Sequence, residues 1–197
     1  PCPAVPRFTL EDLGWNAFFA KSFEPHAAEG WKPARLIRDN KISYGALLDD
    51  GANGFDELEV ILSGKVYHDA ETDADLPAVG DWVALDVGKE GTDTVIRARL
   101  PRQTCFSRKA PGLSTEEQVI AANVDTVIVI TDAETDFNVR RLERYFALIA
   151  RSGAKAVVVI NKIDLTTKEQ NEQAAATIRE LNPQADVLLT SVIKRKG

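Results

Sequence analysis

Residues 156–164, Ala-Val-Val-Val-Ile-Asn-Lys-Ile-Asp, decide the fold class of the second half of this 197-residue chain. The run 156–160 is apolar without alternation, which is typical of a strand buried on both faces. Similar runs occupy 124–130 and 186–189. Helical patterns separate the three runs, one from Asp136 as expected N-cap to Gly153 and one over 168–181. This alternation predicts a parallel sheet with helices covering both of its faces.

The polar residues Asn161-Lys162-Ile163-Asp164 follow directly at the carboxyl end of the middle strand. In this N-K-x-D pattern the Asp164 carboxylate can accept hydrogen bonds from the ring N–H and exocyclic amine of guanine, donors that adenine does not present in that arrangement. Lys162 would lay its aliphatic stem over the base, and the Asn161 amide would brace the loop. The alternative is a polar turn with a helix start at Asp164. The position after a buried strand favours a guanine nucleotide, GTP or GDP, as ligand.

Thr190-Ser191-Val192 follows the next strand, where GTPases place a loop, usually Ser-Ala, whose backbone N–H meets the guanine carbonyl oxygen. We expect Ser191 and Val192 to take this place, although Val192 departs from the more common Ala. An ordinary strand end is the alternative.

Two motifs of a complete GTPase do not occur in the sequence: GxxxxGK[ST], which holds the phosphates and magnesium, and the DxxG loop. We therefore assign no catalytic residue and no metal ligand to this chain. A phosphate loop usually precedes N-K-x-D, but other structure fills that space here. We expect it to follow residue 197 or to be absent.

The first half of the chain has a different pattern. Residues 8–30 have apolar positions near helical spacing, which predicts a short packing helix. From Pro33 the period becomes two: Ile42, Tyr44 and Ala46 alternate, 60–67 is an apolar-rich run, and Val83, Leu85 and Val87 share a face. Turn signals stand at Asp50-Gly51, Val79-Gly80-Asp81 and Glu90-Gly91. Five or so short strands predict an oligonucleotide-binding (OB) barrel, with an SH3-like barrel as the alternative.

The net charge of -6 is unevenly distributed, and residues 94–115 contain five basic residues and no acid. With Ile96, Ala98 and Leu100 pointing inward, Arg97 and Arg99 should point outward. The basic residues form a candidate RNA-binding strip; a solvated charged face is the alternative. The basic strip consists of Arg97, Arg99, Arg102, Arg108 and Lys109.

Other residues exclude several protein classes. Cys2 and Cys105 lie far apart without CxxC spacing, which argues against a disulfide scaffold and a zinc site in these residues. His26 and His68 are isolated and are expected at the surface. No run of 18 apolar residues and no signal-like start is present, so we expect a cytoplasmic protein without a membrane span.

The inverted order, with a barrel ahead of N-K-x-D, resembles the ribosome small-subunit-dependent GTPase A family (RsgA or YjeQ), a group of circularly permuted GTPases. The resemblance covers 97–192 well and the barrel loosely. It rests on Ser-Arg-Lys-Ala at 107–110, on 117–125 and 136–145, on Ser-Gly-Ala at 152–154, and on Asn-Lys-Ile-Asp-Leu at 161–165.

This resemblance implies a protein that binds the 30S ribosomal subunit and 16S rRNA through its barrel, hydrolyses GTP with magnesium and does so faster when bound there, and acts in late subunit maturation. We expect the protein to be a monomer. It also implies a C-terminal zinc module, of which this chain shows nothing. We predict a helical extension over 1–32, an OB barrel over 33–110 and the guanine-reading part of a permuted P-loop GTPase domain over 111–197. The rival hypothesis is a non-catalytic RNA-binding module whose α/β half only scaffolds. A flavodoxin-like ligand domain ranks last because it leaves the placement of N-K-x-D unexplained.

Overall fold

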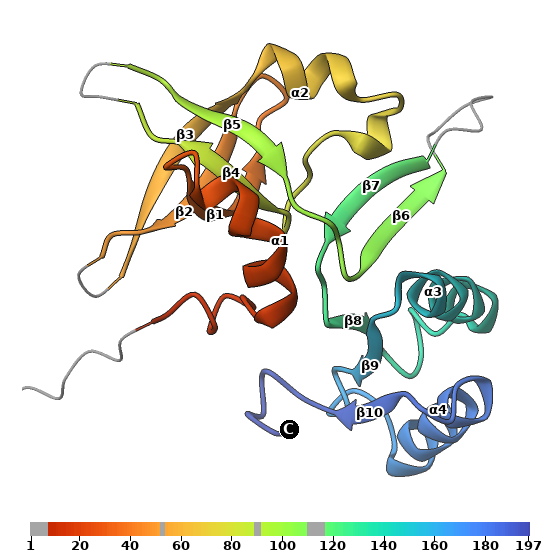
Figure 1. Cartoon of the computed structure of the whole chain (residues 1–197). Helices are drawn as coiled ribbons and strands as arrows, with labels where there is room; N and C mark the ends of the chain where they lie inside the picture. The colour runs from red at the N-terminus through yellow and green to blue at the C-terminus, as the bar shows by residue number, and fades with distance from the viewer. Residues whose placement is uncertain (1–7, 52–53, 89–91, 110–116) are drawn as a thin grey trace, which may run out of the picture. The chain divides into compact units, whose positions relative to one another are not determined.

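Five strands close into a barrel in the computed structural model, in the order β1-β2-β3-β5-β4 (Figure 1). The structure describes residues 8–51, 54–88, 92–109 and 117–197, without the side chain of Lys109. β3 and β5 run parallel, and the other neighbours run antiparallel. This five-stranded Greek-key closure is that of an OB-fold and confirms the predicted barrel. The strands are β1 (Lys32–Asp39), β2 (Tyr44–Asp49), β3 (Phe55–Leu62), β4 (Trp82–Asp86) and β5 (Thr94–Arg99).

The period-two pattern builds the barrel core. Tyr44, Ala46 and Leu48 of β2 alternate into the interior, where they join apolar residues of the other four strands, among them Val60 and Ile96. Burying this apolar surface is the main favourable contribution to folding of the barrel.

Two strand predictions need correction. The run 60–67 is not one strand: β3 ends at Leu62, and Ser63 starts the short helix α2 (Gly64–Asp69) by accepting a hydrogen bond from the Val66 N–H at 3.3 Å. A serine at this place favours a helix start over strand continuation. Val87 lies beyond the end of β4 and is 40% exposed, so it does not share the core face. The expected turn at Glu90-Gly91 lies outside the described residues.

The N-terminal packing helix is confirmed as α1 (Ala17–Ala27). The Asn16 side chain caps it by accepting hydrogen bonds from the second and third backbone N–H groups that follow. Phe19 and Phe23 are buried, and they form an aromatic cluster with Trp82 at the start of β4. The helix is therefore part of the folded barrel unit.

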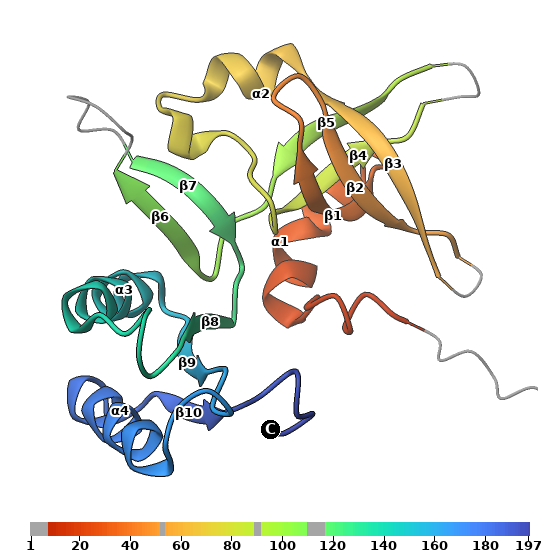
Figure 2. The same cartoon turned by 180° about the vertical axis from the view of Figure 1, so that it is seen from behind.

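A hairpin of β6 (Cys105–Lys109) and β7 (Glu117–Ala122) extends the first unit to Asn123, whereas the sequence placed the domain limit at residue 110. The Ala122 N–H donates to the Val79 carbonyl at 2.8 Å, and the Asn123 amide donates to the Gly80 carbonyl at 3.1 Å. A Cβ at Gly80, whose φ is +90°, would stand 2.0 Å from the Ala122 carbonyl oxygen. Glycine is required for this close approach of two backbones. Figure 2 shows the hairpin from behind. The 3₁₀ turn η1 (Asp73–Asp75) comes between α2 and β4 in the chain.

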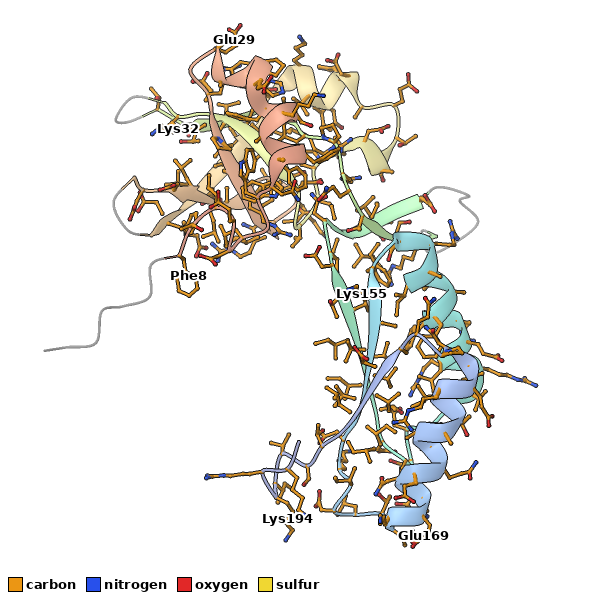
Figure 3. All side chains as sticks on the ribbon, turned by 60° about the horizontal axis from the view of Figure 1, so that its bottom comes forward. Phe8, Glu29, Lys32, Lys155, Glu169 and Lys194 are labelled. Atoms are coloured by element: carbon orange, nitrogen blue, oxygen red, sulfur yellow. The ribbon has the colours of Figure 1, made fainter. Side chains whose placement is uncertain are left out.

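The second unit, Val124–Gly197, contains a three-stranded parallel sheet in the order β10-β9-β8. The strands are β8 (Thr126–Thr131), β9 (Lys155–Ile160) and β10 (Asp186–Leu189), in agreement with the apolar runs of the sequence. The two helices, α3 (Val139–Ser152) and α4 (Lys168–Leu181), lie on the same face of the sheet (Figure 3). The described residues leave the other face open, with Ile128 60%, Ile130 64% and Leu188 51% exposed. The expectation that helices cover both faces is wrong for the described residues.

Capping residues determine where the helices of this unit begin and where α3 ends. Asn138, not Asp136, caps α3, because its side chain accepts from the Arg141 N–H at 3.0 Å, while Asp136 forms an ion pair with the Arg141 side chain. Gly153, at φ +82°, ends α3 as predicted. A capping box between Thr167 and Gln170 starts α4.

Candidate functional site

The N-K-x-D loop and the 190–192 loop lie together at the carboxyl edge of the parallel sheet. Figure 3 labels Lys155 at the start of β9 and Lys194 beyond the end of β10, which marks the direction of the strands. Backbone hydrogen bonds join the strand ends: the Asn161 N–H donates to the Thr131 carbonyl at 2.8 Å, and the Ile163 N–H donates to the Thr190 carbonyl at 3.2 Å. Neighbouring parallel strands thus place two sequence-distant loops side by side.

Asp164 is held by Ser191, whose hydroxyl donates a hydrogen bond to Asp164 Oδ1. Ser191 is fully buried, and its Oγ accepts from the Lys194 N–H at 3.1 Å, so the hydroxyl has a fixed direction. The hydrogen bond from Ser191 lowers the pKa of Asp164, with a smaller contribution from the Lys194 charge. The carboxylate is therefore ionised at neutral pH and oriented, and its two oxygens retain acceptor capacity for a ligand.

Lys162 has a left-handed backbone, with φ +60°. This conformation is uncommon for a residue with a Cβ, and such residues are found where the surrounding structure imposes them. The loop is closed by a hydrogen bond from the Leu165 N–H to the Lys162 carbonyl at 2.9 Å. The Lys162 side chain is 59% exposed, so its aliphatic stem is available to cover a flat ligand.

Asn161 faces the neighbouring loop. Its Oδ1 accepts a hydrogen bond from the Thr190 hydroxyl at 3.2 Å. The amide thus joins the ends of β9 and β10 and helps to hold the loop that carries Lys162 and Asp164.

Val192 is 77% exposed, and its carbonyl accepts from the Arg195 N–H at 3.2 Å in a turn that the Ser191–Lys196 bridge closes. The Val192 side chain therefore points into solvent and does not displace the buried Ser191, although valine is larger than the alanine that is more common at this position.

Sequence reasoning missed three residues near this site. Lys194 and Lys196, together with Asp164, line a cavity of about 330 Å³. The basic run 194–196 directly after Ser191-Val192-Ile193 was the available signal. Asp132, at the end of β8, lies 3.7 Å from Lys162, measured from Oδ2 to Nζ. A single aspartate after a strand matches no motif, so the pattern gave no reason to select it.

The residues of the basic strip differ in exposure and in partners. Arg97 and Arg99 alternate outward from β5 as expected, but Arg97 is engaged by Asp86 at 2.7 Å, and Arg99 is half-buried and donates to the Asp75 carbonyl at 3.1 Å. Arg108 is exposed on β6. The side chain of Lys109 lies outside the described residues.

Arg102 does not lie on the predicted outer face. Its side chain is 11% exposed and forms an ion pair at 2.7 Å with the fully buried Asp81. It also donates to the Ala74 carbonyl at 2.7 Å and the Leu76 carbonyl at 2.9 Å. β5 ends at Arg99, and Leu100 and Pro101 separate this end from Arg102, so the alternation that places Arg97 and Arg99 does not extend to Arg102.

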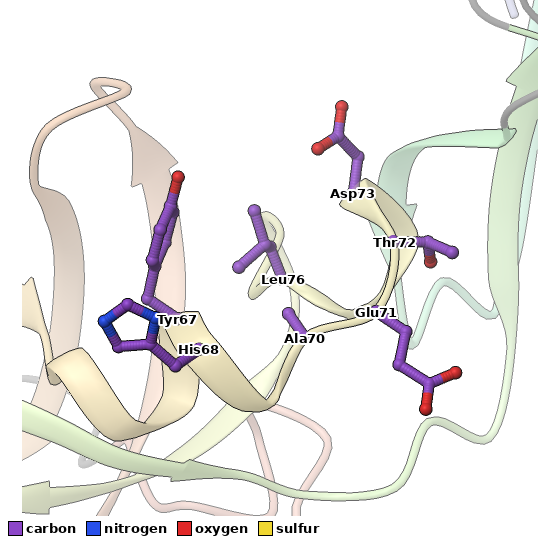
Figure 4. Close-up of a pocket in the computed structure, with 7 residues that line it drawn as sticks. All are labelled: Tyr67, His68, Ala70, Glu71, Thr72, Asp73 and Leu76. Carbon is purple, nitrogen blue, oxygen red and sulfur yellow. The ribbon is translucent and has the colours of Figure 1, made fainter.

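A separate cavity of about 350 Å³ lies in the barrel unit between α2 and η1 (Figure 4). Tyr67 and His68 stand on one side of it, and Glu71 and Asp73 on the other. No group of three His, Cys, Asp or Glu residues suited to a metal ion occurs within the described residues. This cavity contains none of the residues selected from the sequence as candidate ligand contacts.

No helix among the described residues is long and apolar enough to cross a membrane.

Comparison with known proteins gives consistent matches. The family model described as RsgA GTPase matches residues 99–197. A relative from Opitutus terrae, "Small ribosomal subunit biogenesis GTPase RsgA", is 41% identical over an alignment of 197 residues that covers 96% of this chain and 52% of the relative. A relative of the same name from Syntrophotalea carbinolica is 40% identical over an alignment of 175 residues that covers 84% of this chain and 45% of the relative. The chain thus spans about half the length of these curated relatives.

Two solved structures share the fold. YjeQ from Thermotoga maritima superposes with a TM-score of 0.63 at 18% identity and covers 83% of this chain and 53% of its own. YloQ, described as a circularly permuted GTPase, gives a TM-score of 0.61 at 20% identity over 83% of this chain and 52% of its own. At these identities the likeness concerns the fold alone.

Proposed function

Since this chain belongs to the RsgA GTPase family, we propose that Asn161, Lys162 and Asp164, with Ser191 and Val192, bind the guanine base of GTP or GDP. The observation that carries the proposal is the hydrogen bond from Ser191 to Asp164, which joins the two loops predicted to contact the base. A carboxylate fixed in this way can accept from the ring N–H and the exocyclic amine of guanine together. The backbone N–H of Val192 is the expected donor to the guanine carbonyl oxygen.

Guanine is discriminated from adenine by the cost of leaving polar groups unpaired. Adenine presents a ring acceptor where guanine presents a ring N–H, so the Asp164 carboxylate would lose a donor and face a lone pair. The lowered pKa of Asp164 keeps it an acceptor across the neutral range. Lys162 then adds apolar cover over the base rather than selectivity.

The chemistry of hydrolysis belongs, in this proposal, to a longer parent protein. The phosphate-binding and DxxG motifs do not occur in the chain, so the residues present do not supply the magnesium ligands that the family implies. We propose that the parent is a GTPase and that these 197 residues do not hydrolyse GTP alone. The open sheet face of Ile128, Ile130 and Leu188 supports a longer parent protein, because parallel sheets are normally covered on both faces. Any zinc module of the family would likewise belong to the remaining sequence.

For the barrel we propose that it binds the 30S subunit through 16S rRNA and that the parent, a cytoplasmic monomer, assists late maturation of this subunit. The names of the relatives, which refer to small ribosomal subunit biogenesis, support the proposed partner. The proposed phosphate-binding group consists of Arg97, Arg99 and Arg108. Arg102 is not included because its ion pair with Asp81 is buried, whereas the ion pair of Arg97 with Asp86 is exposed. Lys109 stays a prediction from the sequence.

The barrel proposal is tested by changing Arg97, Arg99 and Arg108 together to Glu. Each lost phosphate contact should remove nearly one unit from the slope of log affinity against log salt, so 30S binding should weaken by roughly 10- to 1,000-fold. Circular dichroism serves as the control for folding. Cosedimentation with 30S particles equal to that of the wild type across a salt titration would contradict the RNA contact.

The guanine proposal is tested by competition of GDP and ADP for the whole protein, followed by the fluorescence of a labelled GDP. We expect GDP to compete at far lower concentration than ADP.

The gene sequence beyond the codon for Gly197 distinguishes the GTPase from the rival hypothesis. A downstream GxxxxGK[ST] supports the GTPase, and a stop codon supports a non-catalytic RNA-binding module.

A further inference from the structure

Asp132 is a buried acid at the carboxyl edge of the same sheet, directly after β8, the strand next to β9, which N-K-x-D follows. It is 6% exposed. Its Oδ1 accepts from the backbone N–H groups of Glu134 at 3.0 Å and Asp136 at 2.7 Å, and its Oδ2 accepts from the Thr135 hydroxyl at 2.7 Å. Three hydrogen bonds thus fix the position and direction of this carboxylate.

The strand register brings Asp132 toward Lys162. Thr131, the last residue of β8, pairs with Ile160, the last residue of β9, so the residues beyond the two strands emerge at the same level. Asp132 Oδ2 lies 3.7 Å from Lys162 Nζ. The carboxylate is nearly buried and immobile, whereas the lysine is largely exposed, so the acid is the fixed partner and the lysine is the one that gains order.

Hydrogen bonds lower the pKa of Asp132 to about 2, most of all the bond from the Asp136 N–H and then those from the Thr135 hydroxyl and the Glu134 N–H, and the Lys162 charge adds a smaller lowering. Asp132 is therefore charged whenever a nucleotide could bind at neutral pH. A free lysine side chain samples many rotamers, and ordering it on ligand binding opposes affinity. An anchor for the ammonium reduces this loss before the ligand arrives.

We propose that Asp132 is a positioning residue of the guanine site, which holds the Lys162 ammonium so that the aliphatic stem lies where the base binds. This inference rests on the proposed function. Because the pair is partly exposed, its effect should be moderate: loss of the Asp132 charge should weaken GDP binding by about three- to tenfold.

The test uses Asp132→Asn in the whole protein, with fluorescent GDP as the probe. Asparagine keeps an Oδ1 acceptor for the two backbone N–H groups but removes the charge that faces Lys162. Asp136→Asn is the matched control, because it makes the same charge change at an exposed residue that pairs with Arg141. We expect weaker binding for Asp132→Asn and affinity within about twofold of the wild type for the control. Asp132→Ser, whose hydroxyl can also accept from the loop N–H groups, replaces the Asn variant if that variant has a lowered thermal midpoint.

A double-mutant cycle separates positioning from a general effect on the loop. Lys162→Met keeps an apolar stem without the ammonium, so adding Asp132→Asn to it should cause no further loss of affinity. Equal weakening in both backgrounds would overturn the proposal, as would unchanged GDP affinity of Asp132→Asn beside the wild type. If the wild type itself fails to bind GDP, the proposed function fails, and this role of Asp132 fails with it.

Discussion

Replacing Arg102 by methionine should strongly destabilise the barrel unit, because it removes the partner of a fully buried acid. Arg102 donates from Nε to Asp81 Oδ1 at 2.8 Å and from Nη2 to Asp81 Oδ2 at 2.7 Å, besides its bonds to the Ala74 and Leu76 carbonyls. Breaking a buried pair by removing one partner costs about 3–5 kcal/mol. Asp81 keeps one donor, the Ala78 N–H at 2.8 Å, so we expect the lower part of this range, about 3–4 kcal/mol.

Urea unfolding followed by tryptophan fluorescence measures this loss in the barrel unit alone. All three tryptophans of the chain, Trp15, Trp31 and Trp82, belong to that unit. With a slope of about 2 kcal/mol per molar urea, the midpoint should fall by roughly 1.5–2 M. An unchanged slope would show that stability, and not the extent of unfolding, has changed.

Arg97→Met is the control, since it removes the same kind of side chain from an exposed pair. Arg97 and Asp86 have side chains that are 42% and 41% exposed, and such a pair contributes about 0–1 kcal/mol. If Arg102→Met costs no more than Arg97→Met, the internal role of Arg102 is refuted. Arg102 would then return to the candidate RNA-binding residues.

Two further predictions concern the α/β unit. The pKa of Asp132 is lowered from 3.8 to about 2, so its contribution to stability is fully present above pH 4 and is lost as pH falls toward 2. The difference in unfolding free energy between the wild type and Asp132→Asn, followed by circular dichroism, should therefore be larger at pH 7 than at pH 2.5, by about 1–2 kcal/mol; an equal difference at both pH values would contradict the lowered pKa. The 197-residue chain alone should bind GDP weakly or not at all, because charge-assisted phosphate contacts supply much of the affinity for nucleotides. Calorimetry that shows micromolar GDP binding by this chain would contradict that expectation.

The parts of the fold that local pattern determines were predictable. The apolar runs and helical spacing placed β9, α4 and β10 correctly. The period-two alternation predicted a small barrel of OB type with an SH3-like barrel as the alternative, and the strand order in the structure is that of the OB barrel. The juxtaposition of Asp164 and Ser191 was also foreseeable, because parallel neighbours end at one edge of a sheet.

The predictions from sequence were wrong where two nearby residues could each start a helix. They were also wrong where a residue distant in sequence determines the environment of a side chain. Asp136 and Asn138 are both good N-cap residues two positions apart, and the bond from the Arg141 N–H to Asn138 decides between them. Ser63 converts an apolar run into a helix start. The sequence predicts that Arg102 is an exposed charge. In the structure it is buried because it pairs with Asp81, which is distant in sequence. Asp132 matches no motif, because its significance depends on the register between β8 and β9.

The central claim, that Asp164 reads the guanine base, is tested most directly by the nucleotide preference of Asp164→Asn in the whole protein. Asparagine offers one donor and one acceptor in place of two acceptors, which complements the extra carbonyl of xanthine. We predict that the wild type binds GDP far more tightly than XDP and that Asp164→Asn reverses this order. A variant that still prefers GDP, or a wild type that binds ADP as tightly as GDP, would contradict the assignment.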